Sequence, residues 1–471
     1  MVETGSQGYE RLVERLNQFP QGVPPSETLY GILEILFSER EAALVARLPI
    51  RPFYAETASR LWDLDLQSTR AILQELADRA LLLDVEQNGR RLYTVPPPMA
   101  GFLEFSMMRL RDDVDQKLLG ELLYQYCNVE ENFVKALFAD TGTPLGRVFV
   151  HEPVLPPTAQ VLDYERASEV IRTASHRGLS NCYCRFKMQQ VNRACDAPLD
   201  VCLTFNSAAE SLINHGFARE LDVAEGLDVL QQAYEHNLVQ IGENAREGVA
   251  FICNCCSCCC EALVAARRFE MLRPMTTTNF MPEVQTGTCV GCGKCAEVCP
   301  MDAISVVEVE DPSHGGRRRP LETSGDDNLW HGGRRRPLET DHSLNQEADH
   351  SLGGEVDHRS DQGIGHSFVE IDEEICLGCG LCARVCPTNS ITLQEREERV
   401  ITPYDSTHRI VRLAIEKGQL QNLLFDRQVL WSHRALANVL RVILQLPPLK
   451  RALASEQVKS KYLEALIARF S

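Results

Sequence analysis

Apolar side chains recur at helical spacing along the first part of the chain. They mark one face in each of four successive stretches, residues 27–37, 39–48, 55–64 and 69–80. Residues 83–95 follow with a strand pattern around Asn88-Gly89, a dipeptide that favours the two-residue turn of a β-hairpin. The pattern therefore predicts short helices that are followed by a pair of strands.

This succession resembles a winged helix-turn-helix domain, which would cover residues 25–105. Residues 1–105 hold ten arginines and no lysine against fifteen acidic residues. DNA-binding modules concentrate lysine and arginine on the helix that meets DNA, whereas the stretch STRAILQELADRA holds two arginines against one glutamate and one aspartate. We therefore expect this domain to have a protein-docking or structural role, and we do not expect DNA as a partner.

The next two parts of the chain also read as mainly helical. A Pro-rich passage, HEPVLPPT, marks a connection before residues 161–280, where a helical pattern is interrupted by two groups of cysteines. Residues 404–471 carry further helical stripes with polar faces of mixed sign. The sequence predicts a cysteine-rich helical domain over residues 161–280 and a C-terminal helical segment over 404–471. The expected fold class is thus multi-domain and mainly α.

Residues 311–366 break the pattern, because no apolar face exists there. The run HGGRRRPLET occurs twice without change, at 314–323 and 331–340, and repeats of DHSL follow. A tract of this kind cannot bury enough apolar surface to offset the entropy of ordering it. We interpret residues 311–366 as a disordered repeat insertion.

The composition is that of a folded globular protein. The chain has 471 residues, of which 44% are hydrophobic and 24% charged, and at about 150 residues per domain this length suggests roughly three units. The formal net charge of −18 disfavours nucleic acids and anionic lipids as partners. Since the chain has neither a secretory signal nor an apolar run long enough to cross a bilayer, we expect a cytoplasmic protein without a membrane span.

Eight of the nineteen cysteines form two copies of one unit with the spacing C-x2-C-x2-C-x3-C-P. The thiols of the first copy are Cys289, Cys292, Cys295 and Cys299, and those of the second are Cys376, Cys379, Cys382 and Cys386. The glycines, alanine and valine between the thiols also correspond, and each copy continues into a strand pattern, DAISV or NSITL. The two copies resemble the α+β fold of bacterial dicluster ferredoxins.

The resemblance implies two [4Fe-4S] clusters, which exchange one ligand. In this family the fourth cysteine of each run binds the other cluster, so cluster I would take Cys289, Cys292, Cys295 and Cys386, and cluster II would take Cys376, Cys379, Cys382 and Cys299. Zinc would leave four of these thiols idle. The two halves would cover residues 281–310 and 367–396, and the long loop between them costs little extra closure entropy because the cost grows with the logarithm of length.

Ten further cysteines lie upstream in two groups, which are candidates for additional centres. The first group is Cys182, Cys184, Cys195 and Cys202, and the second is Cys253, Cys255, Cys256, Cys258, Cys259 and Cys260. Such a density of thiols is too reactive to remain bare, so one or two further iron-sulfur clusters or zinc are candidate occupants. Arg185, Lys187 and Arg193 stand among the first group and could offset the charge of a centre. The CxCR and CNCCxCCC motifs, with the dicluster domain, resemble a family of multi-domain iron-sulfur proteins to which no reaction is assigned.

These features favour an electron-transfer component over an autonomous enzyme. The expected function is to carry electrons to or from a partner oxidoreductase, because the chain has no glycine fingerprint for a nucleotide or flavin and no base or pocket recognisable for catalysis. A redox-sensing winged-helix transcription regulator is the alternative, which the order of the domains suits and the charge of the N-terminal domain does not.

Overall fold

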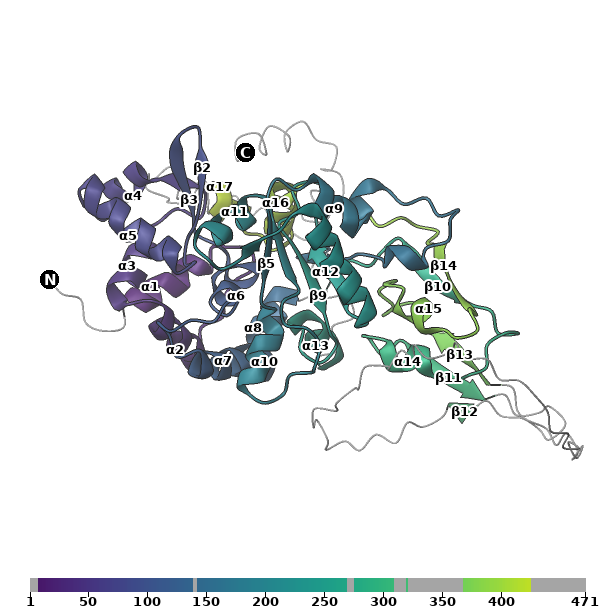
Figure 1. Ribbon diagram of the computed structural model, residues 1–471. Coiled ribbons are helices and arrows are strands. Elements are labelled where there is room, and N and C mark those ends of the chain that lie inside the picture. Colours follow the sequence, from purple (N-terminus) through teal and green to yellow (C-terminus); the bar gives the residue numbers. More distant parts are fainter. Residues whose placement is uncertain (1–6, 139–141, 269–274, 309–318, 321–366, 425–471) are drawn as a thin grey trace, which may run out of the picture.

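The computed structural model of the protein describes residues 7–138, 142–268, 275–308, 319–320 and 367–424. Figure 1 shows N-terminal helices at the left, a sheet with helices in the centre, and a unit of short strands and helices at the right. Helices form the larger share of the regular structure, and the sheets are small. The expected insertion, apart from β12 (Arg319–Pro320), and residues 425–471 of the C-terminal segment lie outside the described residues.

The N-terminal part consists of short helices and a three-stranded sheet in the order β1-β3-β2. Its elements are α1 (Gln7–Leu16), α2 (Glu27–Leu36), α3 (Glu39–Val45), β1 (Phe53–Tyr54), α4 (Ala55–Trp62), α5 (Leu66–Asp78), β2 (Leu83–Gln87) and β3 (Arg90–Thr94). Asn88 and Gly89 join β2 to β3 with φ of 53° and 70°, as a tight hairpin turn requires. The helices and the hairpin lie where the pattern predicted them, and the assignment to the winged helix-turn-helix class stays a prediction.

Carboxylates pair with arginines on and around α5. Arg70 and Arg90 both reach Glu56, with N···O distances of 3.6 and 3.0 Å, and Arg79 pairs with Glu41. Arg91 pairs with the buried Asp84 at 3.1 Å. Each of these arginines therefore has a carboxylate partner, and the expectation that DNA is not a partner stays a prediction.

Residues 98–138 form helices between the N-terminal part and the centre. They are η1 (Pro98–Phe102), α6 (Leu103–Phe105), α7 (Gln116–Tyr124), η2 (Gln125–Val129) and α8 (Glu131–Phe138). The helix α7 contacts both α2 and α10 (Tyr183–Gln190). Cys127 lies buried in this core, with its Sγ 3.7 Å from the Oη of Tyr183.

The centre is built on a six-stranded antiparallel sheet in the order β4-β8-β9-β6-β5-β7. Its strands are β4 (Gly146–Val148), β5 (Arg177–Ser180), β6 (Cys202–Phe205), β7 (Arg219–Glu220), β8 (Val239–Glu243) and β9 (Phe251–Cys255). The prediction of a helical domain over residues 161–280 is therefore wrong. These strands are short, with at most five residues each, and β6 (CLTF) is buried at every position and lacks the apolar-polar alternation by which a strand is recognised.

The helices of the centre cover the two faces of this sheet. They are α9 (Ala167–Thr173), α10, α11 (Asn206–Asn214), α12 (Val223–Glu235) and α13 (Glu261–Arg268), with the short turns η3 (Glu152–Val154) and η4 (Asp163–Glu165) before them. Leu203 and Ile252 pack with α9 and α12 on one face. Because side chains alternate along a strand, Cys202, Cys253 and Cys255 lie on the opposite face.

The third part contains two antiparallel strand pairs, and each cysteine loop connects a strand of one pair to a strand of the other. Strand β10 (Phe280–Val284) pairs with β14 (Ile391–Glu395), and β11 (Ile304–Glu308) pairs with β13 (Ser367–Ile371). The helices α14 (Lys294–Val298) and α15 (Leu381–Val385) follow the cysteine loops. This α+β unit, with its two similar halves, is the one expected from the cysteine motifs.

The chain then returns to the centre through α16 (Ser406–Glu416) and α17 (Leu420–Leu424). Thr143 Oγ1 donates a hydrogen bond to Glu416 Oε1 at 2.6 Å, and Arg409 pairs with the buried Glu243 at 2.9 Å. The described part of the C-terminal segment is thus helical and packed, as expected. Among the described residues no helix is both long and apolar enough to cross a membrane.

His215, at the end of α11, connects the centre to the N-terminal part. Its Nδ1 lies 2.8 Å from Asp78 Oδ1, and its Nε2 lies 2.8 Å from Asp84 Oδ1. The hydrogen bond to Asp84 raises the pKa of His215 above its ordinary value. Burial alone would raise the pKa of Asp84, but hydrogen bonding to His215 outweighs burial and lowers it.

We expect His215 to make the stability of the protein depend on pH. Because its folded-state pKa is raised, its stabilising effect is complete below the unfolded-state pKa of about 6.5 and is lost as pH rises through the folded-state value. His215→Asn should therefore cost about 1–3 kcal/mol at pH 6 and less at pH 9. Unfolding followed by circular dichroism at both pH values measures this, with His236→Asn at the exposed end of α12 as the control. An equal cost at both values would contradict it.

Candidate metal centres

Each cysteine motif of the third part forms a loop that turns into a short helix. Four glycines at matching places between the thiols have left-handed φ values, which are 61°, 75°, 69° and 88° for Gly291, Gly293, Gly378 and Gly380. Residues with a Cβ rarely adopt this conformation. The glycines therefore allow the tight turns by which three closely spaced thiols can surround one cluster.

Four thiols from both motifs meet in the second half of this unit. Cys299, Cys376, Cys379 and Cys382 line one cavity of about 20 Å³, although Cys299 belongs to the first motif. The backbone N–H of Ala303 donates to Cys299 Sγ at 3.2 Å. This is the arrangement that an exchange of fourth cysteines requires, while the ligand assignment itself stays a prediction.

The remaining thiols of the two motifs differ in their exposure. Cys289 and Cys295 are buried, and Cys386 is partly buried. The backbone N–H of Ser390 donates to Cys386 Sγ at 3.2 Å, which matches the contact of Cys299 in the other half. Cys292 is exposed, and Val290 beside it is 60% exposed. The first half therefore presents one thiol of its motif to solvent.

Burial disfavours the thiolate form of these cysteines unless a positive charge lies next to them. Burial raises the pKa of Cys379 to about 12 and that of Cys295 to about 11. Metal binding requires the thiolate, and the charge of the metal offsets the cost of desolvating it. Buried sulfur ligands with inward-donating amides are the donor set of an iron-sulfur cluster.

Comparison with protein families agrees with this geometry. The family model of the 4Fe-4S dicluster domain matches residues 288–390. The resemblance to dicluster ferredoxins is thereby confirmed for this part of the chain. The dicluster domain and the grouped cysteines support an iron-sulfur electron-transfer role for the protein. No curated protein and no solved structure matches the chain significantly.

The fold brings nine of the ten upstream cysteines together in two assemblies, and each assembly has members of both sequence groups. One assembly, here the four-thiol set, consists of Cys195, Cys256, Cys258 and Cys259, whose sulfur atoms all lie within 4.8 Å of one another. Cys195 Sγ lies 3.5 Å from Cys256 Sγ, and Cys258 Sγ lies 3.7 Å from Cys259 Sγ. Hydrogen bonds from Cys256, Cys258 and Cys259 hold the pKa of Cys195 well below its ordinary value. The set therefore favours a thiolate.

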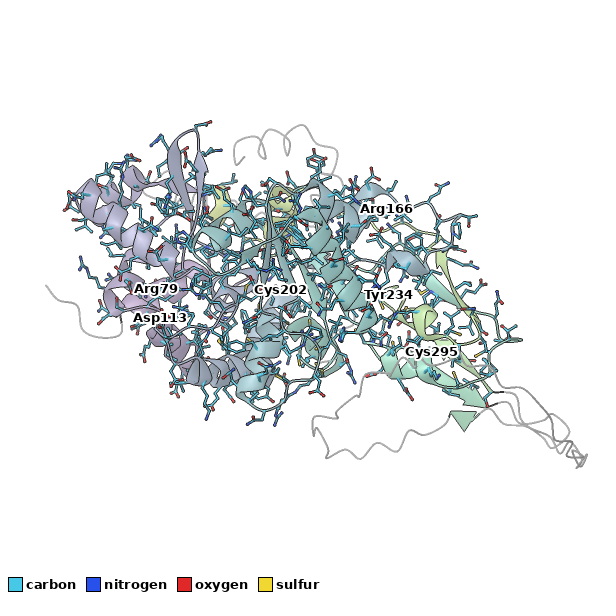
Figure 2. All side chains as sticks on the ribbon, viewed as in Figure 1. Arg79, Asp113, Arg166, Cys202, Tyr234 and Cys295 are labelled. Carbon is cyan, nitrogen blue, oxygen red and sulfur yellow. The ribbon has the colours of Figure 1, made fainter. Side chains whose placement is uncertain are left out.

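A second assembly, here the five-thiol set, consists of Cys184, Cys202, Cys253, Cys255 and Cys260. Cys184 interacts with Cys260, which also interacts with Cys255. Cys253 interacts with Cys255 and with Cys202. Cys202 lies in the centre of the molecule in Figure 2, away from Cys295 of the dicluster domain at the right. Cys182 belongs to neither set, and burial raises its pKa to about 12.

Each set has its own buried cation. Arg185, which is fully buried, donates through Nη2 to Cys256 Sγ at 3.4 Å. Lys187, also fully buried, pairs with Glu261, and both contact Asn128. Of the three basic residues noticed in the sequence, Arg193 instead donates to the hydroxyl of Tyr124.

A cavity of about 90 Å³ adjoins both sets. All five cysteines of the five-thiol set line it, with Cys182 and with Cys256 and Cys259 of the four-thiol set. The rest of its wall is mostly apolar, from residues such as Met99, Phe138, Ile241 and Met275. Glu104 also lines it, and burial raises the pKa of its carboxyl to about 8.

Three residues of this region were missed from the sequence. Glu104, Asn128 and Glu261 surround the five-thiol set or its cation, but each stands in an ordinary helical context. The position of Glu261 directly after the cysteine run was the one signal that could have indicated it. A buried carboxylate requires a partner, and the CCCE sequence places this one at the start of α13.

Proposed function

We propose that this protein is an iron-sulfur relay that passes single electrons between a partner oxidoreductase and a thiol-bound centre in its central part. The observation that carries the proposal is the dicluster match at residues 288–390 together with ten grouped thiols upstream. An electron carrier with further centres in one chain transfers electrons within that chain. The partner is a redox protein or an oxidoreductase subunit, and the chain works in the reducing cytoplasm, where thiols persist.

The dicluster domain holds two [4Fe-4S] clusters in this proposal. Cluster I is bound by Cys289, Cys292, Cys295 and Cys386, and cluster II is bound by Cys376, Cys379, Cys382 and Cys299. The shared cavity around Cys299, Cys376, Cys379 and Cys382 supports the second assignment.

Cluster I faces the partner, and cluster II faces the rest of the chain. The exposure of Cys292 and Val290 supports the first statement. The second rests on three contacts: His151 N–H donates to the carbonyl of Cys379 at 3.1 Å, and Arg384 of α15 contacts Asn237 and lies 4.4 Å from the ring centre of Tyr234. Electrons would thus enter or leave through the first half and pass inward through the second.

The four-thiol set binds one tetrahedral ion, which we propose to be zinc. Four thiolates at about 2.3 Å from Zn²⁺ lie about 3.8 Å from one another in a tetrahedron. The sulfur separations of 3.5 and 3.7 Å, within an assembly no wider than 4.8 Å, suit one ion better than the larger cube of a cluster. Arg185 then offsets part of the negative charge. In this proposal zinc has a structural role, because it takes no part in electron transfer.

Anaerobic purification followed by stepwise reduction tests the relay. We expect low-temperature spin resonance to detect reduced clusters, since potentials of such clusters fall between about −700 and +450 mV. The Cys289→Ala/Cys376→Ala variant should lose about eight irons and the signals of both clusters. Cys127→Ser, at a buried cysteine outside both motifs, is the control and should keep them. A protein without any reducible centre in this range would refute the relay.

A further inference from the structure

The five-thiol set is left unused by the dicluster domain and by the zinc site. We propose that it binds a third [4Fe-4S] cluster, held by four of Cys184, Cys202, Cys253, Cys255 and Cys260. This centre deepens the proposed relay, because it identifies the thiol-bound centre at the inner end of the electron path and its ligands. It rests on the proposed function only in that the dicluster domain supplies or accepts its electrons.

The sheet sets the spacing of these thiols. In the register of β6 and β9, Leu203 pairs with Ile252, so the next pair along the two strands is Cys202 with Cys253. Their Cβ atoms should be about 5 Å apart. Cys255 lies two residues further on the same face, which places its Cα about 7 Å from that of Cys253. Thiols spread over this distance suit the four iron corners of a cluster better than one tetrahedral ion.

The other two thiols of the set come from outside the strands of the sheet. Cys184 lies in α10 and Cys260 directly precedes α13, and the two side chains interact. Five thiols exceed the four that a tetrahedral zinc takes. They form a chain of neighbours from Cys184 through Cys260, Cys255 and Cys253 to Cys202. Ligands therefore reach the site from two strands, from α10 and from the residue before α13.

The surroundings suit an anionic cluster. Lys187, fully buried three residues after Cys184, brings a positive charge that interacts with that thiol. The adjacent cavity of about 90 Å³ is mostly apolar, and a dry setting of this kind shields a cluster from water. Two fully or almost fully buried polar atoms on its wall, Arg185 Nε and Asn254 Oδ1, have no hydrogen-bond partner in the described structure. Unpaired groups of this kind indicate that the cavity receives a bound group.

A continuous apolar core joins this site to the dicluster domain. Cys255 and Cys260 pack in one core with buried cysteines of both dicluster motifs and with Leu263 of α13; these cysteines are Cys289, Cys295, Cys299, Cys379 and Cys382. Arg267, also of α13, pairs with Asp302 at 2.7 Å and fixes the helix to the loop after Cys299. The third cluster would thus be joined by packed side chains to the dicluster domain.

Metal analysis of the full-length protein, purified without oxygen and supplied with iron and sulfide, tests this inference. The unmodified chain should hold about twelve irons and about one zinc. In the Cys184→Ser/Cys260→Ser variant iron should fall to about eight, with zinc and the signals of the dicluster domain unchanged. Two thiols are replaced because at least one of them must be a ligand, whichever of the five is spare.

Matched variants separate the centres. Cys195→Ser/Cys258→Ser should lose zinc and keep about twelve irons, and Cys127→Ser should keep both metals. Mössbauer spectra of the unmodified protein, which need no substitution, should require three clusters. The inference is overturned if the Cys184→Ser/Cys260→Ser variant keeps about twelve irons, or if the unmodified protein holds about eight irons with both dicluster signals intact. If the unmodified protein showed no dicluster signals, the proposed relay would be refuted instead.

Discussion

Cys299→Ala should remove the same cluster as Cys379→Ala, although the two residues belong to different motifs. Both side chains line the cavity that also contains Cys376 and Cys382, and a [4Fe-4S] cluster that lacks one thiolate ligand is easily lost. Each single variant should therefore lose about four irons. The double variant Cys299→Ala/Cys379→Ala should lose no more than about four, because both substitutions affect one cluster.

A second double variant provides the control. Cys299→Ala/Cys295→Ala affects both clusters if the fourth cysteines are exchanged, so it should lose about eight irons. Iron analysis and spin resonance of the four variants measure the pattern. If Cys299 instead belonged to the cluster of its own motif, the losses of the two double variants would be reversed.

Gly378→Ala adds only one methyl group, but it should strongly damage the dicluster domain. Gly378 has a φ of +69°, and a Cβ built there would lie 2.1 Å from the carbonyl oxygen of Phe280 and 2.2 Å from Thr278 Oγ1. The loop cannot move aside easily, since Thr278 Oγ1 donates to the carbonyl of Gly378 at 2.8 Å. We expect a loss on the order of 4 kcal/mol and poor retention of cluster II.

Gly248→Ala is the matched control for this substitution. Gly248 has a similar φ of +64°, but a Cβ at this position would meet nothing within 4 Å. It should cost only about 1–2 kcal/mol, which is the penalty of the left-handed conformation itself. Thermal unfolding and iron content of the two variants measure the difference. Equal effects would mean that conformation and not the close approach of Phe280 decides the outcome.

The dicluster domain could be predicted from sequence because its ligands are close together along the chain. Three thiols at short spacing, with glycines that permit the turns, specify a cluster loop without knowledge of the fold. The two similar halves, with β10 paired to β14 and β11 to β13, then follow from the repetition of the motif. The exposure of Cys292 could not be predicted, since it depends on which half packs against the centre.

The upstream thiols could be recognised in the sequence, but their division into a four-thiol and a five-thiol set could not be predicted from it. The register of β6 against β9 brings Cys202 beside Cys253, while the loop after β9 brings Cys256 to Cys195. These pairings depend on β6, a four-residue strand that is buried at every position and whose sequence CLTF does not alternate. The four-thiol set and the five-thiol set therefore each contain cysteines from both sequence groups. The strands of the central sheet have at most five residues each, so they were missed in the prediction of a helical domain.

The N-terminal elements were the easier part to predict. Serine caps begin α2 and α3, where Ser26 and Ser38 accept hydrogen bonds from Leu29 N and Glu41 N, and Asn88-Gly89 forms the hairpin turn. These are local signals that act within a few residues. The contact of His215 with Asp84 joins distant parts of the chain and had no such signal.

The pairing of β11 with β13 also bears on how this chain can change in length. Glu308 and Ser367 are direct partners in the ladder, so the ends of the segment between them are held side by side by backbone pairing. We expect that residues can be gained or lost after β12, which pairs with β11 through Arg319 and Pro320, without shifting Ile304 from Ile371. The duplicated HGGRRRPLET run stands in this segment. The segment between β11 and β13 is thus a place where evolution can duplicate residues and an engineer can insert a reporter. The dicluster domain keeps its strand register in both cases.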